Sequence, residues 1–395
     1  MGRASPYFGA RRRRIKAMGL APGATGVTIR GMEAIQAVQD LQNSVVLIAD
    51  KATLVRVYVD PASVASAGFI TGEITWRRDG AVGAAFLPAM NSIRIDPMKP
   101  KSVAEQRADL ELSLNFLLPA EAIVAGAVDI TLNRLFVPGA NQLELAPQPP
   151  RRLTFAESVP LRVRVIGLRY QVAGAPGGVA PNSIHFAYLR SYLTRAYPVA
   201  TLEWSQIVVD ADFGPPFGED AAVLANAQIA ALRSREVSGG IDPRTHYYGL
   251  VDDNNGAAFM RGRAFIIPQA PQPDIVASGP CGVPNGFAGD RDPSYADWYA
   301  AHELGHTFGR FHPGFPPTQQ DASDPAFPYP GGLITSADGR YMGFDIGDPA
   351  LNIAMSALLG SRHHDVMTYE DNQWLSAHTY DAIYRRLVLE NQQFT

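Results

Sequence analysis

Three histidines between residues 302 and 312 constrain this chain more than any other feature, because their spacing suits the ligands of a single metal ion. The segment is His-Glu-x-x-His-x-x-Gly-x-x-His. On an α-helix, residues i and i+4 share a face, so His302 and His306 can point at one ion. Gly309 suits the residue that ends a helix with positive φ, after which the chain can bring His312 back to the same ion. Three imidazoles with an open fourth position are typical of a catalytic zinc site.

Glu303 directly follows the first of these histidines, so we expect its carboxylate beside the metal. There it can serve a metal-bound water as a general base. A bare HExxH occurs by chance on the order of once per hundred chains of this length, and the added glycine and histidine make the full pattern about a thousandfold rarer. We therefore interpret the segment as a zinc site on a helix over residues 294–308.

The segment resembles the zinc-binding consensus of the metzincin metalloproteases. The resemblance implies a tight turn downstream that carries a methionine under the zinc, and residues 365–369, Asp-Val-Met-Thr-Tyr, look like that Met-turn. Met367 would then be a soft apolar floor beneath the ligands. Tyr369 matches the tyrosine that astacins and serralysins place near the metal, where it either caps the resting ion or donates to the substrate oxyanion. Pro313 replaces the acidic residue expected for those subfamilies, so the subfamily stays open.

Length and charge restrict the class of protein. A chain of 395 residues predicts two to three domains, and a formal net charge of −4 gives no general attraction to nucleic acid or membranes. The lone Cys281 excludes an internal disulfide framework, and no apolar run reaches the roughly 18 residues needed to span a bilayer. We expect a protein or peptide substrate, no nucleic-acid partner and no transmembrane segment. The sequence does not indicate an oligomeric state.

The first 26 residues are expected to form a flexible basic tail. We interpret the cluster of arginine and lysine at residues 11–16 as solvated chain rather than as a site for nucleic acid or an anionic surface. A signal peptide would continue with an unbroken apolar segment, but glycine and proline interrupt residues 17–23. We expect a bacterial protein that is secreted or delivered outside the producing cell, with a cytoplasmic location as the alternative.

The fold class that we predict is α+β, with a β-sandwich in front of the zinc-binding part. Residues 27–157 contain short runs that alternate apolar and polar residues, separated by turn-forming residues. The clearest runs are 45–49, 53–59, 72–77, 109–116 and 128–132. This pattern predicts an antiparallel, immunoglobulin-like β-sandwich, although no cysteine pair supports a true immunoglobulin domain. We place its boundary near Ser158.

Strands and helices alternate over residues 158–395, which we assign to a metzincin-like α/β catalytic domain. Helices are predicted at 183–197, 221–235, 294–308 and 351–359, with a last one after Ser376. Ser183 and Ser376 are the predicted caps of the first and last helices. This alternation is similar to the N-terminal subdomain of metzincins, a twisted sheet backed by two long helices. In that family an edge strand pairs with the extended substrate, and 260–267 and 274–278 are the candidates here.

Two further motifs are weaker. Residues 252–256, Asp-Asp-Asn-Asn-Gly, have calcium-binding side chains but lack the EF-hand spacing, so Ca²⁺ is unsupported and we favour a plain turn. Residues 280–284, Pro-Cys-Gly-Val-Pro, resemble part of the propeptide motif by which matrix metalloproteases block their zinc with a thiolate. The arginine of that motif is missing, and the segment lies just before the zinc helix. We therefore interpret the match at Cys281 as a coincidence.

Together these features lead us to expect a zinc-dependent endopeptidase. The three histidines would hold one catalytic Zn²⁺, and Glu303 would take a proton from its bound water and pass it to the leaving amine. One alternative is a zinc amide hydrolase that acts on cell-wall peptides, which would use the same chemistry. Another is a non-catalytic binding module with a vestigial zinc site, which the intact Glu303 argues against.

Overall fold

The computed structural model of the chain describes residues 27–393 except 63, 65, 82, 138–141, 144, 146–147, 288–289 and 315–322. The expected tail, with its basic cluster at 11–16, lies outside the described residues. The described residues form mixed α and β structure that is mostly strands, with five α-helices. No helix among them combines the length and the apolar character that crossing a bilayer requires.

Contacts divide the chain into two compact units. The first unit contains Met1–Ser158 and Arg340–Leu359, and the second contains Val159–Gly339 and Gly360–Thr395. The main division therefore falls at the residue where the sequence pattern changes. The return of the chain to the first unit at Arg340 is not expected from that pattern.

The first unit contains two larger sheets. One has the order β1-β4-β8, formed by Thr28–Ile35, Leu54–Asp60 and Leu114–Leu117. The other has the order β3-β11-β9-β5-β6, formed by Leu47–Ile48, Arg151–Ala156, Gly126–Phe136, Gly68–Arg78 and Ala85–Pro88. The short strands β7 (Ile93–Ile95) and β10 (Gln142–Leu143) pair with β5 and β9, and the helix α1 is Val103–Ala108. Neighbouring strands are antiparallel, except that β3 and β11 are parallel.

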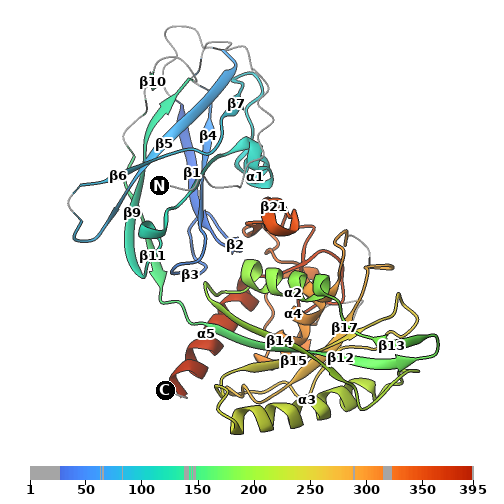
Figure 1. Ribbon diagram of the computed structural model, residues 1–395. Helices are drawn as coiled ribbons and strands as arrows, with labels where there is room; N and C mark the ends of the chain where they lie inside the picture. Colours follow the sequence, from blue (N-terminus) through green and yellow to red (C-terminus); the bar gives the residue numbers. More distant parts are fainter. Residues whose placement is uncertain are drawn as a thin grey trace. The chain divides into compact units, whose positions relative to one another are not determined.

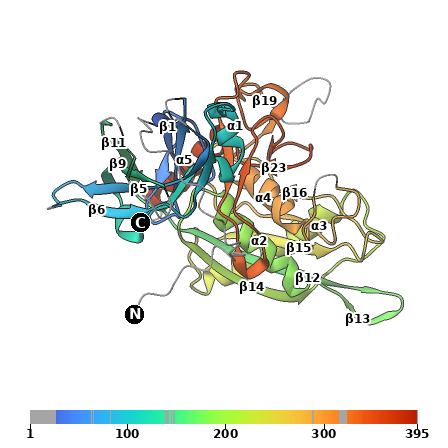
Figure 2. The ribbon, with the colours of Figure 1, turned by 90° about the horizontal axis from the view of Figure 1, so that it is seen from above.

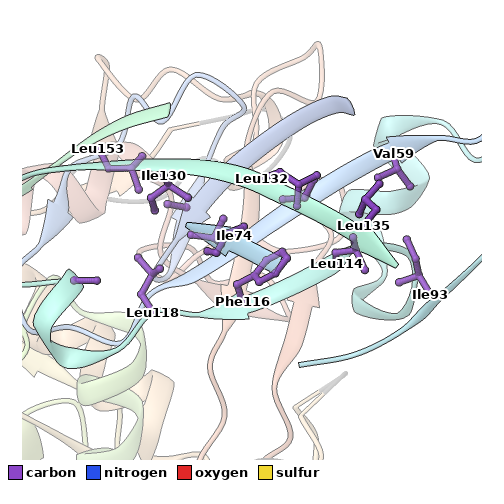
Figure 3. Packing of buried hydrophobic residues seen from close by; sticks show 14 of the residues in the cluster. Val59, Ile74, Ile93, Leu114, Phe116, Leu118, Ile130, Leu132, Leu135 and Leu153 are labelled. Carbon is purple, nitrogen blue, oxygen red and sulfur yellow. The ribbon is translucent and has the colours of Figure 1, made fainter. Parts of the chain in front are cut away.

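The two sheets share one hydrophobic core, shown in Figure 3. Its members come from both sheets and include Val57, Phe116, Ile74, Ile130 and Leu153. Buried and partly exposed residues alternate along β5, which is the period-two pattern from which the strands are predicted. The predicted strand at 109–116 is wrong in its first half, because Leu110–Leu112 forms a 3₁₀ turn before β8. The immunoglobulin-like arrangement of the strands stays a prediction.

The segment Arg340–Leu359 belongs to the first unit, whereas the sequence places it in the C-terminal domain. It forms a third sheet of order β2-β20-β21, made of Val38–Gln39, Met342–Asp345 and Ser356–Leu358. Phe344 is fully buried in one apolar cluster with Ile35 of β1, so hydrophobic burial holds the segment in place. The short helix predicted at 351–359 is wrong, because only Pro349–Leu351 is helical, as a 3₁₀ turn.

The second unit contains a mainly parallel sheet of order β13-β12-β15-β17-β16, with β14 also paired to β12. These strands are β12 (Leu161–Val172), β13 (Ala175–Val179), β14 (Leu202–Asp210), β15 (His246–Asp252), β16 (Arg263–Ala264) and β17 (Ala277–Cys281). Among the described strands, β16 forms an edge and is antiparallel to β17. The segment 260–267 therefore supplies this edge strand, whereas 274–278 leads into β17, which lies between two other strands.

Helices cover both faces of this sheet (Figure 1). The long helices are α2 (Ser183–Ala196), α3 (Ala221–Ser238), α4 (Ala296–Thr307) and α5 (Ala377–Gln393). Ile229 of α3 lies so close to Gly249 of β15 that a Cβ there would be 2.1 Å from its Cδ1. On the other face, Phe186 of α2 lies against Gly167 of β12, and α2 also packs on α4. The β12–β13 hairpin projects from the sheet (Figure 2).

The predicted helix boundaries are close but need two corrections. Asn182, not Ser183, caps α2, because the side-chain oxygen of Asn182 accepts from the N–H of Ile184 at 2.8 Å. The helix α4 begins at Ala296 rather than at 294, and the hydroxyl of Ser294 accepts from the N–H of Ala296. Asparagine and serine are both good N-cap residues. Which of two neighbouring candidates caps a helix depends on the local turn geometry, which the sequence does not specify.

Candidate metal centre

The helix α4 has a buried face that fixes its position. Its predicted apolar residues Ala300, Leu304 and Phe308 are buried, as their four-residue spacing requires. The hydroxyl of Tyr197, at the end of α2, donates a 2.6 Å hydrogen bond to the carbonyl of Ala301. The histidines that α4 carries therefore have a rigid support.

Gly309 ends α4 in a left-handed turn, as its place in the motif predicts. Its φ is +77°, and its N–H bonds to the carbonyl of His306 while the N–H of Arg310 bonds to the carbonyl of Gly305. These two hydrogen bonds form a Schellman motif, which reverses the chain at a helix end. The chain then enters the short strand β18 (His312–Pro313), which carries the third histidine.

We expect Gly309→Ala to lower the free energy of unfolding by about 1–2 kcal/mol or more in urea denaturation. A side chain there would have an unfavourable φ, and its Cβ would lie 2.7 Å from the carbonyl oxygen of Pro268 and 2.3 Å from a nitrogen of Arg386. Gly174→Ala is the control, because Gly174 has a φ of +87° with open space around a Cβ. Equal losses in the two variants would show that the close contacts at Gly309 are unimportant.

The three predicted histidine ligands converge on one point. Nε2 of His312 lies 3.2 Å from Nε2 of His302 and 3.1 Å from Nε2 of His306. Two nitrogen ligands of a tetrahedral zinc ion are about 3.3 Å apart, since each Zn–N distance is about 2.0 Å. All three side chains are buried, with 4–6% of each residue exposed. The donor set therefore fits zinc in number, type and spacing.

Hydrogen bonds and burial keep the imidazoles of His302 and His306 neutral. Nδ1 of His302 is 2.8 Å from the carbonyl oxygen of Val366, and Nδ1 of His306 is 2.7 Å from that of Arg310. A carbonyl only accepts, so each Nδ1 carries the proton and each Nε2 keeps its lone pair for a metal. Burial lowers the pKa of His302 well below its ordinary value and lowers that of His306 to about 4.

We expect His306→Ala to lose about one bound zinc ion per chain relative to the parent, measured by elemental analysis after unbound metal is removed. Two imidazoles would remain, fewer than the three protein ligands that catalytic zinc sites use. His378→Ala is the control, because His378 contacts Asp324 at 2.9 Å and is not part of the histidine cluster. Full retention of zinc in the His306→Ala protein would show that the ligands are assigned incorrectly.

Glu303 is buried beside these ligands and contacts the edge of the sheet. Burial raises the pKa of its carboxyl to about 8, although a hydrogen bond with the backbone of Ala264 acts in the opposite direction. Ala264 belongs to the edge strand β16. A Cβ on Gly262, just before that strand, would lie 2.4 Å from Oε1 of Glu303, so the close approach requires glycine. Glu303 therefore lies on the histidine-bearing helix and contacts the edge strand.

Met367 packs against the helix that carries the first two histidines. A Cβ on Gly305 would come within 2.4 Å of the Met367 sulfur, so the thioether lies directly on α4. The buried carboxylate of Asp365 holds this turn, because it accepts from the N–H of Met367 at 2.9 Å and from the N–H of Ser376 at 3.0 Å. The resemblance to the Met-turn assigns no role to Asp365, although an aspartate at the start of a tight turn is a usable signal.

Tyr369 lies next to the histidine cluster, where the resemblance implies a tyrosine. Its ring centroid is 4.7 Å from that of His312 and 5.5 Å from that of His302. Tyr369 is 63% exposed, in contrast to the buried ligands. The phenol is therefore placed to meet a group of a substrate rather than to fill the core.

A cavity of about 660 Å³ adjoins the candidate site, and His302, Glu303 and Tyr369 form part of its wall. Aromatic rings line another part of it, with Phe287 and Trp298 at 5.1 Å between centroids. No local sequence pattern predicts this aromatic wall, because its rings come from separate segments. The cavity is large enough to take a substrate side chain.

The two weaker motifs lie apart from the histidine cluster. The side chain of Cys281 is fully buried and groups with His185 and Asp252, not with the three histidine ligands. It is therefore not placed to block the candidate catalytic metal, which agrees with interpreting its motif as a coincidence. Residues 254–256 all have positive φ and form a turn, as the plain-turn interpretation predicts.

Comparison of this chain with models of known protein families and with curated proteins found no match. The candidate site brings together three imidazoles, a buried carboxyl group and an exposed tyrosine.

Proposed function

We propose that this chain is a zinc-dependent endopeptidase of the metzincin kind, with the second unit as its catalytic domain. The observation that carries the proposal is the convergence of three imidazoles beside the buried carboxyl of Glu303. His302, His306 and His312 would hold the Zn²⁺. When bound, the ion supplies a Lewis acid for a carbonyl group and a nucleophilic water at neutral pH.

The residues of the chain perform the proton transfers and stabilise the developing charge. Glu303 takes a proton from the attacking water and delivers it to the leaving amine as the C–N bond breaks. Contact with the backbone of Ala264 holds the carboxyl group in one orientation. Tyr369 donates a hydrogen bond to the oxygen of the scissile carbonyl as negative charge develops on it.

The edge strand β16 supports an extended peptide as the substrate. It lies at an edge of the described sheet, and its Ala264 and the preceding Gly262 lie against Glu303. A peptide that paired with this strand would extend the sheet and pass the carboxyl group. The adjoining cavity, with its aromatic wall, would receive one side chain of that peptide.

For the first unit we propose a supporting or substrate-presenting module with an immunoglobulin-like β-sandwich. Two sheets that share one core favour this architecture. Of the candidate metal clusters among the described residues, none lies in this unit. Catalysis is therefore assigned to the second unit alone.

The decisive test is to incubate the full chain with casein, with a peptide library and with cell-wall sacculi, each with and without a chelator. We expect cleavage of casein that stops with the chelator and returns when zinc is added. Cleavage of sacculi without cleavage of casein would favour a zinc amide hydrolase instead. If the chelator changes nothing on any substrate, the enzyme proposal fails and a binding module becomes the better account.

A further inference from the structure

Two features that the proposed catalytic site leaves unused lie together at one end of the sheet in the second unit. Asp252 ends β15 and Cys281 ends the parallel strand β17, and the two residues are partners in the strand register. His185, in the first turn of α2, joins them. One nitrogen of His185, one carboxylate oxygen of Asp252 and the sulfur of Cys281 all lie within 4.8 Å of one another.

Hydrogen bonds indicate which nitrogen of His185 carries the proton. Nε2 is 3.2 Å from the amide nitrogen of Asn182, which only donates, so Nε2 is an acceptor. The proton is therefore on Nδ1, 2.7 Å from the hydroxyl oxygen of Ser294. The lone pair of Nε2 also faces a carboxylate oxygen of Asp252 at 3.4 Å. That approach is repulsive unless a cation lies between the two groups.

The surroundings of the three residues are negatively charged and buried. The neighbouring Asp253 is 5% exposed, and its Oδ1 has no hydrogen-bond partner among the described residues. Within the same residues, neither Asp252 nor Asp253 forms an ion pair with lysine or arginine. Burial, reinforced by both carboxylates, raises the pKa of the Cys281 thiol well above its ordinary value. A bound cation would compensate the carboxylates and allow the thiol to ionise.

We propose that His185, Asp252 and Cys281 bind a second zinc ion, which is independent of the proposed catalytic site. Imidazole, carboxylate and thiolate are all zinc ligands, whereas calcium takes oxygen ligands. The 3.4 Å between Nε2 of His185 and Oδ2 of Asp252 suits two ligands of a tetrahedral zinc ion, which are about 3.3 Å apart. Binding forms a zinc–sulfur bond as the Cys281 thiol releases its proton to solvent.

This ion would stabilise the start of the helix α4. Ser294 contacts Nδ1 of His185, and a metal-bound imidazole is usually oriented in this way by a partner of its second nitrogen. The hydroxyl of Tyr295, just before α4, donates to Asp253 at 2.9 Å. The first contact joins the proposed ligand His185 to Ser294, and the second joins Asp253, the chain neighbour of a proposed ligand, to Tyr295. Ser294 and Tyr295 directly precede the histidine-bearing helix.

Zinc X-ray absorption on the full chain tests the second site directly. Parent protein loaded with zinc and freed of unbound metal should hold about two zinc ions per chain and show a zinc–sulfur distance of about 2.3 Å. Cys281→Ser should lose the sulfur signal and about one of these ions. His378→Ala, which removes a histidine that contacts Asp324 instead, should keep both ions and the sulfur signal.

The His306→Ala variant separates this proposal from the proposed catalytic site. It should still hold about one zinc ion, with sulfur as a neighbour. A zinc-saturated parent whose zinc has only nitrogen and oxygen neighbours would overturn the second site, and so would a folded His306→Ala protein without zinc. These two measurements decide the question even if Cys281→Ser does not fold.

Discussion

Glu303→Gln is expected to lower kcat on a good peptide substrate by roughly 10²- to 10⁴-fold or more, the typical contribution of a general base. Glutamine has nearly the shape of glutamate, and its carbonyl oxygen can keep the hydrogen bond with the backbone of Ala264. It cannot take a proton from water. Because Glu303 is not a metal ligand in this assignment, zinc content and the unfolding midpoint should stay those of the parent.

Glu370→Gln is the matched control for this variant. Glu370 is another carboxylate in the wall of the same cavity, but it is not part of the histidine motif. Its replacement likewise turns a carboxyl group of the cavity wall into an amide and should leave kcat within about tenfold of the parent, far from the loss of a general base. A Glu303→Gln protein with the kcat of the parent would remove Glu303 from the mechanism.

The candidate site can be predicted from the sequence because its geometry is mostly local. The first two histidines lie one helical turn apart. The positive φ of Gly309 then turns the chain so that the third histidine lies beside them. The structure brings these three histidines together as the spacing predicts. Met367 and Tyr369 are different, since a family resemblance and not their spacing points to them, and only the structure shows which atoms they contact.

Features that depend on pairing between distant residues cannot be predicted in this way. The pairing of β20 with β2 joins segments about three hundred residues apart, and no local periodicity in either one specifies the other. The cluster of His185, Asp252 and Cys281 cannot be predicted either, because each residue comes from a different element. The role of Asp365 is not predicted for a different reason. Aspartate is common in turns, and the hydrogen bonds that this one accepts from two backbone groups are seen only in the folded structure.

Tyr369→Phe is expected to lower kcat and kcat/KM together by about a hundredfold, with KM nearly unchanged and zinc retained. The phenol lies beside the ring of His312, and Tyr369 is exposed, so it can reach a substrate oxygen. A hydrogen bond that forms only as charge develops stabilises the transition state and not the bound substrate. Removal of one such donor costs roughly 2.7–4 kcal/mol, of which a hundredfold loss is the lower end.

The kinetic pattern separates this role from two others. If Tyr369 were a ligand of the resting metal ion, Tyr369→Phe would change the zinc affinity. A fourth protein ligand is unnecessary, because three imidazoles already hold the ion. If it only packed in the turn, the variant would stay within about twofold of the parent, far from the loss that a missing donor causes. Tyr341→Phe is the control for loss of a phenol, because Tyr341 contacts Arg340 in the first unit. A hundredfold loss of kcat in Tyr369→Phe alone, at constant zinc content, is the result that identifies the phenol as the oxyanion donor.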